Sequence, residues 1–381
     1  MLHKDVLLVI PDAHLRKTFD LYNFLKKRYQ CLLLSEFDIG RLSLVYGRKL
    51  EKIDHSSGEN FANAMDQIAA KYSDKRLVYM PVTENGISLF LKYKDKTPHK
   101  HWHYTLPKED DFQLARNKYE LNQFLLEKGL PAPKIYSKED IPSLHENFKP
   151  LVAKRRNGGG AVGLFYVNES SHLSKLDNLD WDNYVVQEKL TGSVVKGEFY
   201  FMSGGKVISH YGHERIRTSP PSGGVTVFSV SRVDPDMREL GEQILSALNW
   251  EGIAMIEFMC DEQMKPKVIE INPRVWGSIL LSDFTGTQLM DNYIRVAIGE
   301  KPTVTVADEG KYIRWFLPLD LINARRPVGR TKAFWNFKNT IFEAWSHANV
   351  FSALAWFMYY SFNLGRFNKG GKKILKKLGI R

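Results

Sequence analysis

The chain has 381 residues and a formal net charge of +11, from 54 Lys and Arg against 43 Asp and Glu. Because single hydrophobic cores stop growing near ~250–300 residues, this length predicts more than one domain. The composition, 43% apolar and 25% charged, excludes collagen-like, low-complexity and wholly disordered chains. Cys31 and Cys260 are too few for a disulfide framework or a thiolate metal cluster, and the apolar run ending at Pro11 is too short for a signal peptide. A cytoplasmic protein is therefore expected.

Residues 1–108 predict a small parallel α/β lobe. Apolar runs at Asp5–Ile10, Cys31–Leu34 and Leu77–Met80 have the length of buried strands. Between the first two, Leu15–Tyr29 carries apolar residues at helical spacing. Strand, helix and strand in this order are typical of an open parallel sheet.

Residues 109–303 change in texture and predict an α+β domain with mostly antiparallel strands. Leu114–Lys128 predicts an amphipathic helix, which Gly129 and the prolines after it end, and Met237–Leu248 predicts a second helix. Short β-rich runs separated by Gly and Asn predict the strands Leu151–Lys154, Leu164–Val167, Tyr184–Glu188, Glu198–Met202, Lys206–His210, Val225–Val230, Ile253–Cys260 and Val268–Asn272.

The glycine run Gly158–Gly163 satisfies the pattern G-x-G-x-x-G, but a predicted strand follows it, whereas a dinucleotide-binding fingerprint requires a helix there. The run is therefore expected to be a loop between two antiparallel strands. Lys154 stands just before it and offers a cation beside backbone N–H groups, which suits a polyphosphate. An ordinary glycine-rich hairpin tip explains the same residues equally well.

Two predicted strands, Ile253–Cys260 and Val268–Asn272, can pair as a hairpin. A symmetric register places Glu257 directly opposite Glu270, and alternation puts Asn272 on the same face. Like charges directly opposite in a sheet are destabilising, so the pair predicts a hard-cation site, with Mg²⁺ bridged to phosphates. A solvated strand face with a tolerated Glu pair is the alternative. Arg274 follows the strand and could neutralise charge on a transferring phosphoryl group.

These residues resemble the ATP-grasp superfamily, and within it the carbamoyl-phosphate-synthase-like branch. The resemblance covers about residues 110–300, and its most specific element is VIEINPRVWGS (Val268–Ser278). It implies an ATP-grasp fold of two α+β subdomains, with a pre-ATP-grasp-like lobe ahead of it. It also implies ATP and Mg²⁺ as cofactors, with Mn²⁺ as a substitute.

The resemblance assigns roles to individual residues. Glu257, Glu270 and Asn272 would bind the metal, and Arg274 would contact the transferred phosphate as a catalytic residue with Lys154. The residues implied in ATP binding are Lys118, Lys154, the loop residues Gly158, Gly159 and Gly160, the adenine-reading linker residues Glu188 and Leu190, and Glu198 on the ribose hydroxyls.

The implied activity is that of an ATP-dependent carboxylate–amine ligase, which activates a small-molecule or glycan-linked carboxylate as an acyl phosphate and releases ADP. Carboxyphosphate or carbamate chemistry is an alternative. A non-catalytic ATP-binding factor of glycan or envelope assembly, associated with a membrane, is another.

Residues 304–381 predict a C-terminal extension with an aromatic helix and a basic tail. Ala344–Gly365 contains no Asp, Glu, Lys or Arg, and no acidic residue follows Glu343. The tail contributes the cations Arg366, Lys369, Lys372, Lys373, Lys376, Lys377 and Arg381. Two interpretations fit: an interfacial helix on the anionic inner face of a membrane, or a helix packed on the protein body. Nucleic acid is not expected as a partner, because the excess charge lies mainly in the tail and no recognition motif accompanies it.

Overall fold

The computed structural model describes residues 3–55, 57–96, 102–159, 162–219, 225–315, 320, 337–343 and 347–367. Gly160 and the basic residues from Lys369 onward lie outside this described part. The chain divides into two compact units: Met1–Tyr104, Val275–Leu280 and Phe342–Arg381 form the first, and Thr105–Arg274 and Leu281–Ile341 the second. The C-terminal segment thus joins the N-terminal lobe, a division that differs from the consecutive segments 1–108, 109–303 and 304–381.

The first unit contains a parallel sheet with the strand order β3-β2-β1-β4-β5. Its strands are β1 (His3–Ile10), β2 (Tyr29–Ser35), β3 (Leu50–Lys52), β4 (Arg76–Tyr79) and β5 (Trp102–His103). Every residue from Val6 to Ile10 is buried, as expected of a central strand covered on both faces. The predicted parallel α/β lobe is confirmed.

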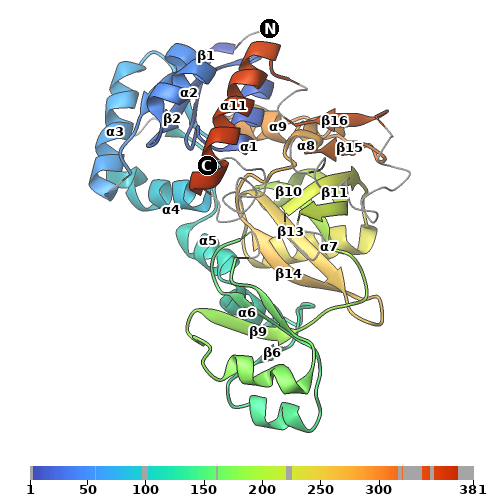
Figure 1. Cartoon of the computed structure of the whole chain (residues 1–381). Helices are drawn as coiled ribbons and strands as arrows, with labels where there is room; N and C mark the ends of the chain where they lie inside the picture. Colours follow the sequence, from blue (N-terminus) through green and yellow to red (C-terminus); the bar gives the residue numbers. More distant parts are fainter. Residues whose placement is uncertain are drawn as a thin grey trace. The chain divides into compact units, whose positions relative to one another are not determined.

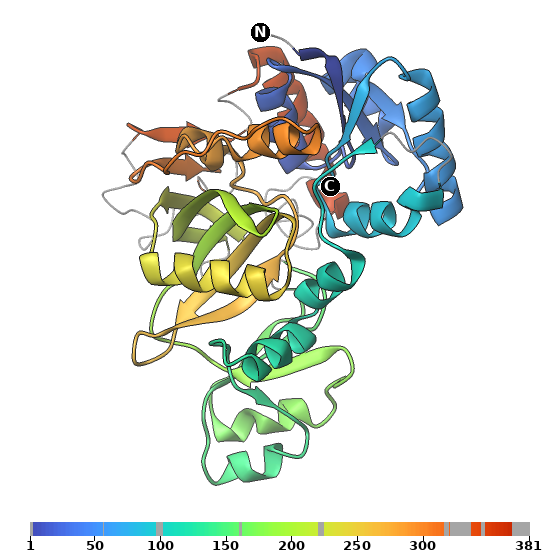
Figure 2. The same ribbon diagram turned by 180° about the vertical axis from the view of Figure 1, so that it is seen from behind.

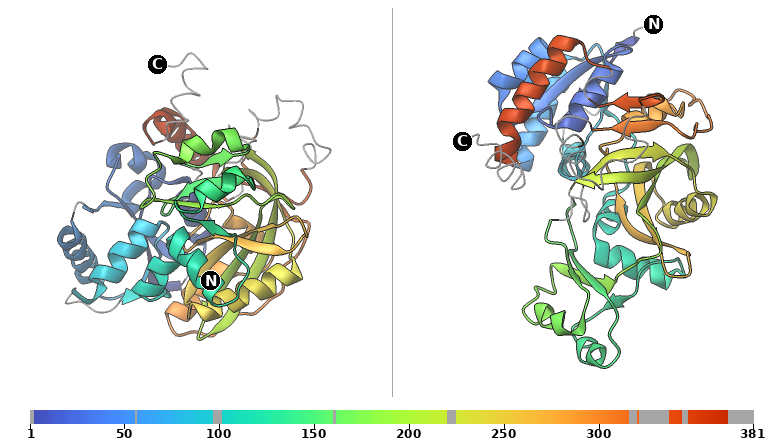
Figure 3. Two further views of the ribbon diagram at one scale, coloured as in Figure 1. Left: turned by 90° about the horizontal axis from the view of Figure 1, so that it is seen from below. Right: turned by 45° about the vertical axis from the view of Figure 1, so that its right-hand side comes forward.

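The described α-helices of the first unit begin either with or without a side-chain cap. They are α1 (Arg16–Leu25), α2 (Ile39–Tyr46), α3 (Gly58–Lys71), α4 (Glu84–Tyr93) and the C-terminal α11 (Val350–Phe367). Ser57 caps α3 by accepting from Asn60 N, and Thr83 caps α4 by accepting from Gly86 N. Within this unit α11 packs beside α2, visible as the red helix against the blue elements (Figure 1; Figure 3).

The N-terminal part of the second unit carries a small antiparallel sheet with the order β6-β9-β7-β8. Its elements are β6 (Ile135–Tyr136), β7 (Leu151–Arg155), β8 (Phe165–Val167) and β9 (Tyr184–Glu188), preceded by the helices α5 (Glu109–Arg116) and α6 (Lys118–Glu127). The expectation of one helix over 114–128 is wrong. Asn117 leaves the helical conformation and accepts hydrogen bonds from Tyr119 N and Glu120 N, so a new helix begins at Lys118.

The larger sheet of the second unit has the order β14-β13-β10-β11-β12-β15-β16. Its strands are β10 (Lys196–Ser203), β11 (Lys206–Ser219), β12 (Val225–Ser231), β13 (Gly252–Cys260), β14 (Pro266–Asn272), β15 (Tyr312–Arg314) and β16 (Thr340–Phe342). The helix α7 (Pro235–Ala247), capped by Asp234, packs on β10 and β11 (Figure 2). The short helices α8 (Leu280–Phe284) and α9 (Leu289–Ala297) follow β14.

Strand register sorts the side chains of this sheet onto two faces. Glu257 pairs with Gly197, Gly197 with His213, and His213 with Ser231, so these four residues share one face. Glu198, next to Gly197 on β10, belongs to the opposite face. Tyr200 lies on that opposite face and donates its hydroxyl to Arg238 O of α7 at 2.8 Å. The helix therefore covers the face that Glu257 does not occupy.

Candidate functional site

The two predicted glutamates face each other across the last hairpin of the large sheet. Glu257 of β13 pairs directly with Glu270 of β14, and Met255 pairs with Asn272, so the predicted register is confirmed at both positions. It is wrong nearer the turn, where a bulge after Glu257 makes Cys260 pair with Pro266. Glu257 and Asn272 are buried, and the Glu270 side chain is 21% exposed.

Cationic side chains approach both carboxylates. Arg215 of β11 forms an ion pair with Glu257, and Lys118, the first residue of α6, lies 3.3 Å from Glu270. Arg274 donates to Asn272 Oδ1 at 2.7 Å. Lys154 of β7 donates to the carbonyl oxygen of Ile269 at 2.7 Å, beside Glu270. The second unit thus brings Lys118, Lys154 and Arg274 to the Glu pair.

Arg215 is a member of this cluster that sequence reasoning missed. The predicted strand ended at His210, whereas β11 continues to Ser219. The alternation of His213 and Arg215 on the face of Glu257 was the available signal, although it becomes readable only once the partner strands are known.

Burial and the crowded charges shift the pKa values of this cluster. Burial raises the pKa of Glu257, and Glu270 raises it further, although Arg215 opposes both effects. Burial would also raise the pKa of Glu270, but Lys118, Lys154, Asn272 and Arg274 together lower it. Burial lowers the pKa of Lys154 to about 8. Glu270 is therefore the carboxylate held ionised by its cationic neighbours.

The glycine loop lies against this cluster. Lys118 Nζ donates to the carbonyl oxygen of Gly158 at 2.6 Å, and Gly158 and Gly163 have φ values of 99° and 78°, in the left-handed region. A Cβ on Gly159 would lie 3.4 Å from Arg274 Nη2. The described glycines of the loop thus bring backbone groups to the cations that face Glu270.

The predicted adenine linker lies at the end of β9. Glu188 donates its N–H to Lys134 O at 2.9 Å, and its carboxylate accepts from Lys134 N at 3.0 Å and from Lys267 Nζ at 2.5 Å. Its side chain therefore fixes the linker to β14 and to the segment before β6. Leu190, two residues on, is buried. The backbone N–H of Glu188 is therefore already used within the protein.

The structure places Glu198, the predicted partner of the nucleotide ribose, apart from the Glu257 face of the sheet. Glu198 is completely buried on the face opposite Glu257, where its carboxylate lies 2.7 Å from His210 Nε2. Burial raises its pKa well above the usual range and lowers that of His210 to about 3. The sequence spacing from the linker does not show this position, because the face of a residue depends on strand pairing.

The oxygen atoms of the Glu pair and of Asn272 could supply some of the ligands of a hard divalent cation. Glu257, Glu270 and Asn272 offer only oxygen ligands, the type that Mg²⁺ prefers. In the described part of the chain, no group of three or more His, Cys, Asp or Glu could hold a metal by itself. Mg²⁺ is commonly bound by one or two carboxylates together with substrate phosphates, and this donor set matches that arrangement.

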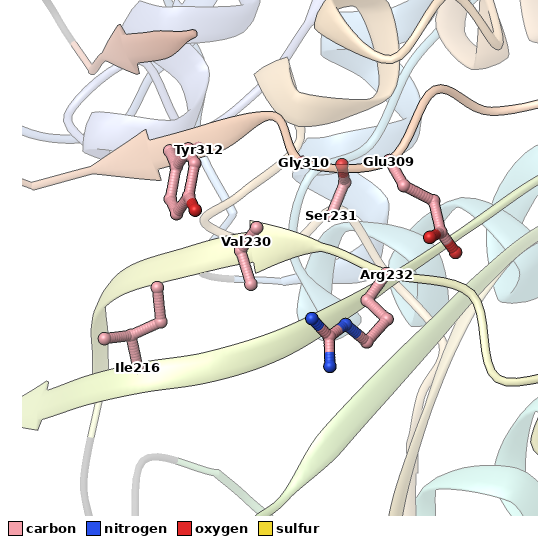
Figure 4. A pocket seen from close by; sticks show the side chains of 7 residues that line it. All are labelled: Ile216, Val230, Ser231, Arg232, Glu309, Gly310 and Tyr312. Atoms are coloured by element: carbon pink, nitrogen blue, oxygen red, sulfur yellow. The ribbon is translucent and has the colours of Figure 1, made fainter. Parts of the chain in front are cut away.

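A cavity of about 560 Å³ lies elsewhere on the large sheet (Figure 4). Val230 pairs with Glu214 and with Tyr312, which places it on the face opposite Glu257. The lining residues are Ile216, Val230, Ser231, Arg232, Glu309, Gly310 and Tyr312. None of the predicted site residues lines this cavity.

Comparison with known proteins gives a domain family for residues 115–278 and a fold for the chain. A family model described as an ATP-grasp domain matches residues 115–278, and a search of the curated proteins found no match. Among solved structures, a biotin carboxylase from Campylobacter jejuni superposes with a TM-score of 0.60 at 18% identity, covering 80% of this chain and 74% of that chain.

Two further solved structures have the same fold. An ADP complex of N5-carboxyaminoimidazole synthetase from Staphylococcus aureus has a TM-score of 0.61 at 15% identity, covering 82% of both chains. An L-amino acid ligase from Bacillus licheniformis has a TM-score of 0.56 at 17% identity, covering 79% of this chain and 75% of that chain. At these identities the likeness is one of fold.

Proposed function

We propose that the chain is an ATP- and Mg²⁺-dependent ligase, because residues 115–278 match a family model described as an ATP-grasp domain. The reaction joins a carboxylate to an amine and releases ADP and phosphate. The observation that carries this proposal is the facing Glu257–Glu270 pair with Lys118, Lys154 and Arg274 around it. The cationic side chains suit the phosphates of a nucleotide, and the carboxylates suit the metal ion bound to those phosphates.

Each side chain takes a role that follows from its position. Lys118 and Lys154 bind phosphate oxygens, and the glycine loop supplies backbone N–H groups above them. Arg274 stabilises the charge of the phosphoryl group during its transfer to the substrate carboxylate. Glu257, Glu270 and Asn272 would hold Mg²⁺, which supplies Lewis-acid stabilisation of the phosphates when bound. The carbonyl oxygen of Glu188 and the backbone of Leu190 would read the adenine.

The chemistry proceeds through transfer followed by substitution. A carboxylate oxygen accepts the γ-phosphoryl group and ADP leaves. The amine then attacks the acyl phosphate, an amide bond forms, phosphate leaves and the amine loses a proton. No covalent enzyme nucleophile is needed in this scheme. The substrates proposed are a small-molecule or glycan-linked carboxylate and an amine.

Carboxyphosphate or carbamate chemistry is the second candidate. Two of the similar folds carry names of that kind, a biotin carboxylase and an N5-carboxyaminoimidazole synthetase. The L-amino acid ligase supports the first candidate in the same way. The two candidates differ in their acceptor, since bicarbonate replaces an organic carboxylate in the second.

A substrate screen tests the proposal. Full-length protein with MgATP is mixed with panels of carboxylates and amines, ADP formation is followed, and products are identified by mass. A ligase should form ADP only when both substrate classes are present. ADP formation that requires bicarbonate and one amine favours the second candidate. Tight MgATP binding without ADP formation under any combination supports a non-catalytic ATP-binding factor and contradicts the ligase proposal.

A further inference from the structure

The C-terminal helix α11 is attached to the first unit by one face. Ala353, Trp356 and Tyr359, three residues apart, are 1%, 2% and 5% exposed. The Trp356 ring stacks on Phe19 of α1 with the ring centroids 4.7 Å apart. Tyr359 donates its hydroxyl to Asp38 at 3.5 Å. This face explains why the helix belongs to the N-terminal lobe.

The other face of α11 is apolar too, although it is open to solvent. It carries a stripe at helical spacing formed by Val350, Phe351, Leu354, Phe357 and Met358, with exposed fractions of 65%, 86%, 46%, 36% and 55%. A helix of a soluble protein normally turns polar residues to water. A contiguous exposed apolar patch marks an interaction surface.

Cations are present on the helix that packs beside α11 and follow α11 in sequence. Burial lowers the pKa of His347, three residues before α11, and the nearby cations Lys27 and Arg28 lower it further. The neighbouring helix α2 exposes Arg41, and the turn after it exposes Arg48 and Lys49. In sequence, seven cations and no acidic residue follow between positions 366 and 381. Of the acidic residues nearby, Asp38 accepts from Tyr359, and Glu343 is buried beside Arg16 at 3.3 Å.

We propose that the exposed stripe of α11, together with the cations of the neighbouring α2 and those that follow α11 in sequence, binds an anionic lipid surface, with the helix lying in the plane of the interface. Aromatic and aliphatic side chains beside a run of Lys and Arg are the combination that such helices use. In the described part of the chain, no helix is long and apolar enough to cross a membrane. The buried face keeps the protein attached to the helix while the stripe enters the lipid headgroup region.

Vesicle co-sedimentation of the full-length chain tests this. The stripe is changed by Phe351→Ser with Leu354→Ser, and the matched control is Val304→Ser with Val306→Ser, two exposed valines of the second unit. Wild type and control should bind vesicles of phosphatidylcholine with phosphatidylglycerol, and not phosphatidylcholine alone. The stripe variant should bind at least about tenfold more weakly, since it loses apolar area.

Removing positive charge from the tail provides an independent test of the proposal. In Lys372→Gln with Lys373→Gln, each lost cation should weaken binding roughly fivefold, and added salt should reduce the difference. The proposal fails if anionic vesicles are not bound, or if stripe and lysine variants bind as wild type does. It also fails if the stripe variant turns a dimer into a monomer in size-exclusion chromatography while vesicle binding is absent, because a second copy would then cover the stripe.

Discussion

Replacing Glu270 by Gln changes the stability of the protein through two opposing effects, the repulsion between two carboxylates and the attraction of one carboxylate to lysines. The change keeps the size of the side chain and removes its negative charge. Relief from Glu257, directly opposite, stabilises the protein by about 0.2–1 kcal/mol. Loss of the attraction to Lys118, 3.3 Å away, and to Lys154 acts in the other direction. Removing one partner of a fully buried ion pair costs about 3–5 kcal/mol.

The loss of the attraction to the lysines should outweigh the relief of the repulsion between the carboxylates. The Glu270 side chain is 21% exposed, so the lost interaction is worth less than in a fully buried pair, and we expect a net loss of about 2 kcal/mol at pH 7. For a unit of this size that corresponds to a fall in melting temperature of about 4–8 °C. If only the repulsion between the facing carboxylates is considered, the variant is expected to be more stable than wild type.

The pH dependence provides a check on the cause. The pKa of Glu270 is lower in the folded protein than its ordinary value of 4.5, so its contribution is complete above that value and is lost as the pH falls below it. The stability difference between wild type and Glu270→Gln should therefore shrink below pH 4.5.

Thermal and urea unfolding measure these stabilities, with Glu262→Gln as the control. Glu262 is exposed in the turn of the same hairpin, so its change should stay within about 0.5 kcal/mol. Turnover of Glu270→Gln should be abolished. A variant as stable as wild type at pH 7 would refute the reasoning that Glu270 holds the surrounding cations.

Three further changes test other members of the site. Arg274→Lys should lower turnover at least about tenfold, because an ammonium cannot reproduce the planar fork of a guanidinium; undiminished turnover would remove its role. Lys154 has a pKa of about 8 and should lose its positive charge above that pH. The affinity of the wild-type protein for ADP, measured in EDTA, should therefore fall by up to about tenfold per pH unit above 8, whereas that of Lys154→Arg should not. Glu198→Gln should leave ATP affinity unchanged in calorimetry, since this carboxylate lies against His210 on the opposite face; a large loss would restore the ribose role.

The strands were the most predictable part of the fold. Tyr184–Glu188 was recovered in full, and Val225–Val230 lacks only the last residue of β12, because short β-branched runs between turn residues identify strands well. The break between α5 and α6 was not predicted. Helical periodicity continues through Asn117, and only the capping geometry of that single side chain starts a new helix.

The residues of the candidate site also fall into those that could be predicted from sequence and those that could not. Glu257 and Glu270 could be paired from sequence because they belong to one hairpin, although the bulge between this pair and the turn was not predicted. Arg215 is 42 residues from Glu257 in sequence and reaches it across β10. The position of Glu198 was not readable from sequence for the same reason, since the face that a residue occupies depends on which strand lies beside it. Local register is readable from sequence, whereas the order of strands in the sheet is not.

The balance of charge at the site predicts the order in which ligands bind. Among the described residues, the cations Lys118, Lys154, Arg215 and Arg274 act on two carboxylates, an excess of two positive charges when all are ionised. A divalent cation arriving alone would add to that excess, whereas ATP or ADP would reverse it.

We therefore expect Mg²⁺ alone to bind the protein weakly, and to bind at least about tenfold more tightly once ADP is present, equivalent to about 1.4 kcal/mol of coupling. Calorimetric titration of Mg²⁺ into the protein, with and without ADP, measures both affinities, and a titration into ADP alone corrects for the metal held by free nucleotide. Arg215→Met removes one cation from the same site and should strengthen the binding of Mg²⁺ alone. Equal Mg²⁺ affinity in the free and ADP-bound protein would contradict this order, because the cations would then not be what keeps the metal out.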